Sequence, residues 1–72
     1  MNDKTTNETP LAKAVRLSGG QTALGNLIGR RQSTVRTWLL NGGKVPGEAA
    51  KDIEAALDGA VTREELRPEI FS

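Results

Sequence analysis

Apolar residues recur at helical spacing on both sides of one glycine near the middle of the chain. Before Gly29 they are Leu24, Leu27 and Ile28, and after it they are Val35, Trp38 and Leu39. Spacing of i, i+3, i+4 gives each segment one apolar helical face. The pattern predicts helices over 21–28 and 32–40 that cross at a tight turn. Two small residues suit this crossing, Gly29 at the turn and Gly25 at the close approach. Trp38, in register with Val35, is predicted to anchor the core.

The flanking segments carry helix start and stop signals. Thr9-Pro10 combines an N-cap residue with a proline suited to the first helical position, and predicts a helix over 10–18 that ends at Gly19-Gly20. Pro46 opens a fourth helix to about residue 57, which Asp58-Gly59 terminates. Its predicted inward residues are Ala49, Ile53, Ala56 and Leu57. Thr62-x-x-Glu65 is a capping box that predicts one further helical turn.

These elements define the predicted fold class: an all-α, compact five-helix domain, with four main helices plus a short C-terminal turn. Residues 1–8 are polar without apolar periodicity, and we expect a disordered N-terminal lead before a domain spanning residues 9–72. Seventy-two residues bury little apolar surface, so a second copy is expected as partner. Leu66, Ile70 and Phe71 pack either back onto the domain or against that copy. We favour the copy slightly, because the monomer core is small.

The composition excludes most kinds of catalysis. The chain has no cysteine and no histidine, so thiol and imidazole nucleophiles, bases and metal ligands are absent, and we expect no metal or cofactor. An enzyme would need a carboxylate pair in a pocket, whereas the acids lie at exposed helical positions or chain ends. No apolar run approaches the roughly 20 residues of a membrane span, and the N-terminus has no signal-peptide core. We expect a cytoplasmic protein that is neither an enzyme nor membrane-bound.

Charge is segregated although the net charge is only +1. Residues 11–47 carry six cations and no acid: Lys13, Arg16, Arg30, Arg31, Arg36 and Lys44. Residues 48–72 carry seven acids against three cations. An acid-free basic half and an acidic half within one small domain indicate one side that faces a polyanion and another turned away from it.

The second central helix presents a hydrogen-bonding face without acids. Its outward residues are Gln32, Ser33, Arg36 and Thr37. Arg36 suits guanine and Gln32 suits adenine, while Ser33 and Thr37 can serve either a base or a phosphate. Two helices with this turn form a helix-turn-helix, whose second helix enters the DNA major groove. Predicted phosphate contacts lie around it, several of them near helix starts: Gln21, Thr22, Arg30, Arg31, Thr34, Asn41 and Lys44.

From residue 11 to 71 the chain resembles helix-turn-helix proteins of the Cro/phage-repressor type, and more particularly the YdaS-like prophage Cro-like regulators. The resemblance is carried by Ser18-Gly19-Gly20-Gln21, Ala23-Leu24-Gly25, Leu27-Ile28-Gly29, Gln32-Ser33-Thr34-Val35, Trp38-Leu39, Lys44-Val45-Pro46 and the tail from Gly59 through Leu66-Arg67-Pro68 to Phe71. It implies a five-helix DNA-binding protein that binds operators, commonly as a dimer.

The resemblance also implies site roles. It implies that Gln32, Ser33 and Arg36 read bases with Thr37 close by, and that Gln21 fixes a phosphate while touching Gln32. Two departures matter. Arg30-Arg31 stand where the family has an apolar residue and then a small polar cap. Gly25 stands where alanine is commoner, at a cost of roughly 1 kcal/mol in helix propensity.

The sequence therefore predicts a sequence-specific transcriptional regulator, a Cro-like repressor that binds double-stranded DNA through the major groove, as a homodimer on a near-palindromic operator. The alternative is an antitoxin or other protein-interaction module whose acidic C-terminal half binds a protein partner. The resemblance allows both roles together, since the YdaS-like group has been linked to toxin–antitoxin pairs.

Overall fold

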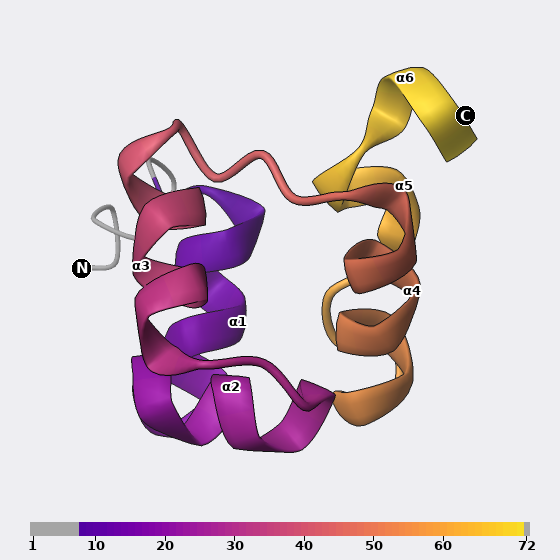
Figure 1. Ribbon diagram of the computed structural model, residues 1–72. Coiled ribbons are helices and arrows are strands. Elements are labelled where there is room, and N and C mark those ends of the chain that lie inside the picture. Colours follow the sequence, from indigo (N-terminus) through magenta and orange to yellow (C-terminus); the bar gives the residue numbers. More distant parts are fainter. Residues whose placement is uncertain (1–7, 72) are drawn as a thin grey trace, which may run out of the picture.

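The computed structural model describes residues 8–71, and within this range every regular element is a helix. Two groups of helices face each other across the core, α1–α3 on one side and α4–α6 on the other (Figure 1). The bounds are α1 (Pro10–Ser18), α2 (Gln21–Ile28), α3 (Gln32–Leu40), α4 (Gly47–Ala56), α5 (Arg63–Leu66) and α6 (Pro68–Phe71). The all-α fold class is confirmed. The predicted C-terminal turn comprises two short helices, and residues 1–7 of the predicted lead lie outside the described range.

The predicted caps fix several of these ends. The Thr9 hydroxyl accepts a hydrogen bond from the Ala12 N–H at 3.1 Å, with Pro10 in the first helical turn. The capping box before α5 is complete: Glu65 N–H donates to Thr62 Oγ1 at 3.2 Å, and Thr62 N–H donates to Glu65 Oε1 at 2.9 Å. Helix α4 starts one residue later than predicted, because Pro46 has the extended backbone of an N-cap.

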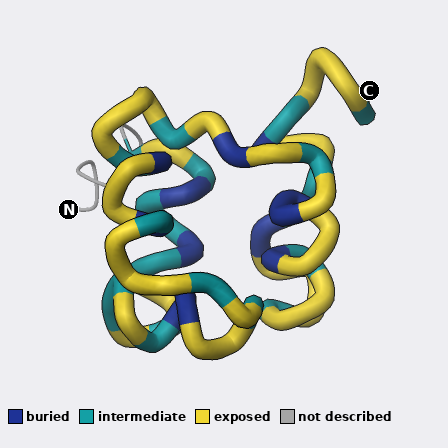
Figure 2. Tube along the Cα trace, in the orientation of Figure 1, coloured by how far each residue is buried: buried dark blue, intermediate teal, exposed yellow. Residues whose placement is uncertain are grey.

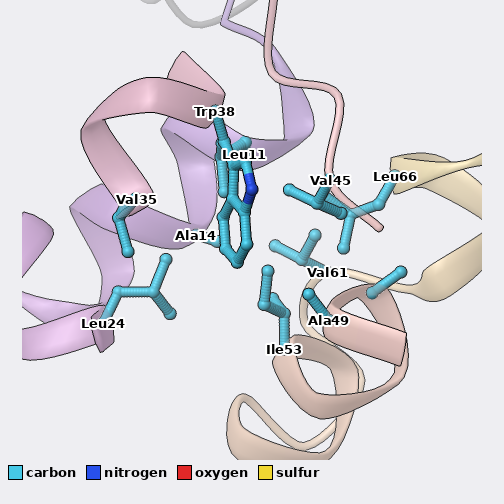
Figure 3. Packing of buried hydrophobic residues seen from close by; sticks show 11 residues of the cluster. Leu11, Ala14, Leu24, Val35, Trp38, Val45, Ala49, Ile53, Val61 and Leu66 are labelled. Carbon is cyan, nitrogen blue, oxygen red and sulfur yellow. The ribbon is translucent and has the colours of Figure 1, made fainter. Parts of the chain in front are cut away.

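The core lies between the two helix groups and has Trp38 near its centre (Figure 3). The Trp38 side chain is 8% exposed, which confirms its predicted role as anchor. Its ring lies between Leu24 and Val35 on one side and Val45 and Val61 on the other (Figure 3). The buried set is Leu11, Ala14, Leu24, Val35, Trp38, Val45, Ala49, Ala50, Ile53, Val61 and Leu66.

Two predicted core residues face outward instead. Leu27 is 55% exposed and Ala56 is exposed, while Ala50 is buried. Leu27, Ile28, Asp52, Ala55 and Ala56 line one shallow surface depression between α2 and α4. The small alanine side chains of α4 do not reach over Leu27, so the edge of the α2 stripe stays open to solvent.

The C-terminal residues turn back onto their own domain. Leu66 is buried in the core, and Phe71 packs against it. Phe71 Cζ lies 3.6 Å from the point where a Cβ on Gly47 would be, so α6 rests on the start of α4. Lys51 and Arg63 lie over the Phe71 ring, at 6.0 and 5.7 Å from its centroid. Ile70 remains 50% exposed. Two of the three apolar tail residues are thus used within the chain.

Gly25 is required by the crossing of the turn over α2. A Cβ built on Gly25 would lie 2.6 Å from the Arg30 carbonyl oxygen, and the Arg30 N–H donates to the Gly25 carbonyl at 2.8 Å. We expect Gly25→Ala to lower the free energy of unfolding by about 1–3 kcal/mol, because the displaced backbone outweighs alanine's better helix propensity. Urea unfolding measures this change. Asn26→Ala, at the exposed neighbouring position, is the control and should not destabilise. A Gly25→Ala variant as stable as the wild type would contradict the expectation.

Candidate nucleic-acid interface

Helix α3 stands on the outer side of the α1–α3 group, away from α5 and α6 (Figure 1). Val35 and Trp38 point into the core, while its opposite face is exposed along its length (Figure 2). The exposed face holds the four residues predicted to contact bases: Gln32, Ser33, Arg36 and Thr37. In the described part of the chain the C-terminal segment does not cover them, so this face is open to a ligand.

Gln32 is held in place by Gln21. The Gln32 Nε2 donates to Gln21 Oε1 at 2.6 Å, the contact that the resemblance implied. Gln32 therefore keeps its carbonyl oxygen and a second N–H, the acceptor and donor that an adenine edge requires. Gln21 keeps both amide protons at the start of α2, where the N-cap Gly20 makes no side-chain capping bond. Donors of this kind at a helix start suit a phosphate.

The other base-contact candidates differ in what they offer. Thr37 is exposed, and its hydroxyl donates to the Ser33 carbonyl at 3.0 Å, which leaves its oxygen as an acceptor. Arg36 is exposed and forms an ion pair with no carboxylate of residues 8–71. Its guanidinium has the forked donors that recognise a guanine O6 and N7.

The two arginines of the turn are placed differently. The Arg30 guanidinium lies over the Trp38 ring, 5.9 Å from its centroid, and its Nη2 is 3.9 Å from Asp52 Oδ2 of α4. At that distance the pair is weak, and Arg30 remains available to a phosphate. Arg31 is exposed and is the N-cap of α3, without a side-chain capping bond. The start of α3 therefore has no side-chain cap, because an arginine stands where the family has a small polar cap.

The remaining predicted phosphate contacts lie at the ends of α2 and α3 and in the segment that follows α3. Thr22 is exposed in the first turn of α2, and Thr34 is partly buried in that of α3. Asn41 is exposed at the end of α3, where its backbone N–H donates to the carbonyls of Thr37 and Trp38. Lys44 is exposed in the segment that leads to α4. Three of these four residues are thus exposed to a ligand, and their contacts with phosphate stay predictions.

One pairing on this side was missed by the sequence analysis. Glu8 accepts two hydrogen bonds from Arg16, both 2.9 Å long, and these bonds lower the pKa of the Glu8 carboxyl. Arg16 is thus neutralised within the chain. The available signal was the single acid just before the Thr9-Pro10 helix start, but its distance of eight residues from Arg16 does not by itself predict contact.

The two charge classes of the sequence occupy two sides of the molecule. The cations of residues 11–47 lie on α1–α3 and the segments that follow them, whereas most acids lie on α4–α6 (Figure 1). Two of these acids pair with local arginines: Arg63 Nε donates to Glu54 at 2.6 Å, and Arg67 donates to Glu69. Hydrogen bonds from Arg63 lower the pKa of Glu54. The carboxylates are therefore kept away from the exposed face of α3.

This arrangement, two helices crossing at a glycine turn with the second exposed, defines a helix-turn-helix protein of the Cro type. The solved structure of "the Cro protein from putative prophage element Xfaso 1" of Xylella fastidiosa strain Ann-1 matches with a TM-score of 0.84 at 38% identity, over 89% of this chain and 97% of that one. Residues 11–72 match the family model described as "Bacterial toxin YdaS", and the chain belongs to that family.

A curated relative supports the same assignment. The "Putative transcriptional regulator YdaS" of Escherichia coli strain K12 is 38% identical over 58 residues, which are 81% of this chain and 59% of the relative. The chain thus spans less than two thirds of that relative's length. Among the described residues, no helix has the length and apolar character needed to cross a membrane.

Proposed function

We propose that this Cro-like regulator binds double-stranded DNA in a sequence-specific manner and represses transcription by occupying an operator in the cytoplasm. The observation that carries the proposal is the open face of α3, where Arg36 and a Gln32 braced by Gln21 stand free of carboxylates. Both side chains keep the donor and acceptor groups that distinguish base edges in the major groove. The relatives that are named a regulator and a Cro protein support the same function.

A homodimer on a near-palindromic site fits the size of the chain. Its longest dimension is 33 Å, close to the roughly 34 Å of one turn of duplex. Two copies of this size can lie side by side about one turn apart, so a second copy would place its α3 in the next major groove. The half-exposed Ile70 on α6 remains available to that copy.

Selection of duplexes from a random pool with the purified protein tests the proposal. The expected result is a near-palindromic sequence with half-site centres about 10–10.5 base pairs or a multiple apart. Gel shift and sedimentation on the selected duplex then give the number of chains bound. Failure to enrich or shift any duplex would overturn the proposed function.

Two substitutions separate base reading from phosphate binding. Arg36→Ala should lose about 1–3 kcal/mol of discrimination at one position of each half-site, because its forked donors are the guanine contact. Lys44→Ala should weaken all sequences alike, because a phosphate contact carries no base information. Competition binding with a panel of single-base variants of the selected duplex measures both profiles. If the two variants lost affinity with the same sequence profile, this assignment of roles would be wrong.

The second candidate function is a protein-interaction module. The acids gathered on α4–α6, opposite the α3 face, favour it, because such a side is suited to a basic protein partner. Reversing one exposed charge in the full chain, Glu64→Lys, should leave DNA affinity unchanged or slightly raised if the DNA-binding function is correct. A wild-type chain that shifts no duplex but binds a defined basic protein, and loses it on this reversal, would favour the second candidate.

A further inference from the structure

Leu40 is an apolar side chain on the face of α3 that is otherwise polar. It is 73% exposed, more than Leu17, Leu27 or Ile70, the other large apolar side chains at the surface of residues 8–71. Its neighbour Leu39 packs against the core instead. Leu40 is not part of the core, so its exposed side chain does not stabilise the monomer.

The register of α3 places Leu40 with the base-contact candidates. It follows Arg36 by four residues and Thr37 by three, so the three side chains lie on one helical face. The other exposed apolar side chains lie on α1, α2 and α6. Leu40 is the member of this set that would enter a groove together with Arg36.

We propose that Leu40 reads a thymine through apolar contact with its C5-methyl group. This inference rests on the proposed function. The thymine methyl is the apolar feature that base pairs display in the major groove, and apolar side chains recognise it by contact. Helix geometry puts Leu40 roughly 12 Å along α3 from Gln32, which corresponds to about three to four base pairs at roughly 3.4 Å each. The thymine should therefore lie at the opposite edge of the half-site from the base that Gln32 contacts.

Replacement of thymine by uracil removes only that methyl group and so isolates the contact. Each thymine of the selected duplex is changed to uracil in turn, in both half-sites at once, and binding is measured by fluorescence anisotropy. For the wild type, one position should lose about fourfold in affinity per half-site, as expected when one methyl group returns to water. Leu40→Ala should bind the thymine duplex more weakly and should not respond to uracil at that position.

Leu27→Ala is the matched control, because Leu27 is a second exposed leucine and lies off this face. It should keep both the affinity and the uracil response of the wild type. Three results would overturn the proposal: a selected half-site without thymine, tolerance of uracil at every position by the wild type, or an unchanged uracil response in Leu40→Ala. Uniform weakening by Leu40→Ala together with weaker self-association in sedimentation would assign Leu40 to a dimer contact and overturn it too.

The failure of this inference is distinguishable from failure of the proposed function. A protein that selects a palindrome and shifts it, yet ignores the thymine methyl, still binds DNA, and only the role of Leu40 is wrong. A protein that selects and shifts no duplex overturns both.

Discussion

Raising the salt concentration from 50 to 200 mM is expected to weaken operator binding by about 10³–10⁵-fold, because each phosphate contact releases a condensed counterion. The estimate assumes roughly six to ten phosphates neutralised per dimer. The structure offers cations for this contact: Arg30 is only weakly paired, and Arg31 and Lys44 are exposed. The measurement is anisotropy with the selected duplex over this range, plotted as log affinity against log salt concentration.

Lys44 and Lys51 provide the matched pair for this experiment. Lys44→Ala removes one predicted phosphate contact from each chain and should make the slope shallower by about 2 per dimer. Lys51→Ala removes a cation that lies over Phe71 on the acidic side, and should leave the slope unchanged. Binding that does not respond to salt, or equal slopes for the two variants, would contradict the electrostatic assignment.

Replacement of Trp38 by alanine should have the largest effect on stability. We expect a loss of about 3–5 kcal/mol in the free energy of unfolding, the range for truncating a buried aromatic side chain. A domain of this size has a small reserve, so much of the variant should be unfolded at 37 °C. The substitution also removes the ring over which Arg30 lies. Urea and thermal unfolding followed by far-ultraviolet circular dichroism measure the change.

Two variants control for the Trp38 result. Trp38→Phe keeps an aromatic ring in the core and should lose less stability than alanine does. Leu40→Ala, on the same helix but 73% exposed, should change the free energy of unfolding by no more than about 0.5 kcal/mol. A Trp38→Ala variant with a cooperative transition within about 1 kcal/mol of the wild type would show that Trp38 is not the anchor.

The helix bounds could be predicted because the residues that start and end each helix act over a short distance along the chain. Thr9, Gly29 and the Thr62–Glu65 box act on residues within one turn of themselves, and each is where its pattern placed it. It was harder to predict which residues of each helix are buried. Leu27 fits a helical stripe yet is exposed, because burial depends on whether the facing α4 side chains are long enough to cover it. That property belongs to the packing of α2 on α4 and is not encoded in either helix alone.

The candidate site likewise has features that the sequence predicted and features that depend on packing. The outward positions of α3 follow from helical periodicity, and the contact of Gln21 with Gln32 follows from the resemblance. The Arg16–Glu8 pair and the placement of Arg30 near Trp38 and Asp52 depend on how neighbouring segments pack against one another. No spacing rule supplies this packing. The roles of the individual site residues on DNA stay predictions for the binding experiments above.

The separation of cations on α1–α3 from acids on α4–α6 gives the molecule an electric dipole moment whose positive end is the side that carries α3. Under the proposed function, the field of a duplex would turn this moment before contact, so that α3 would arrive facing the groove. Orientation of this kind raises the productive fraction of encounters, and with it the association rate, whichever bases are present. Under the same proposal, the acids of α4–α6 would speed association with DNA by orienting the molecule, without contacting a phosphate themselves.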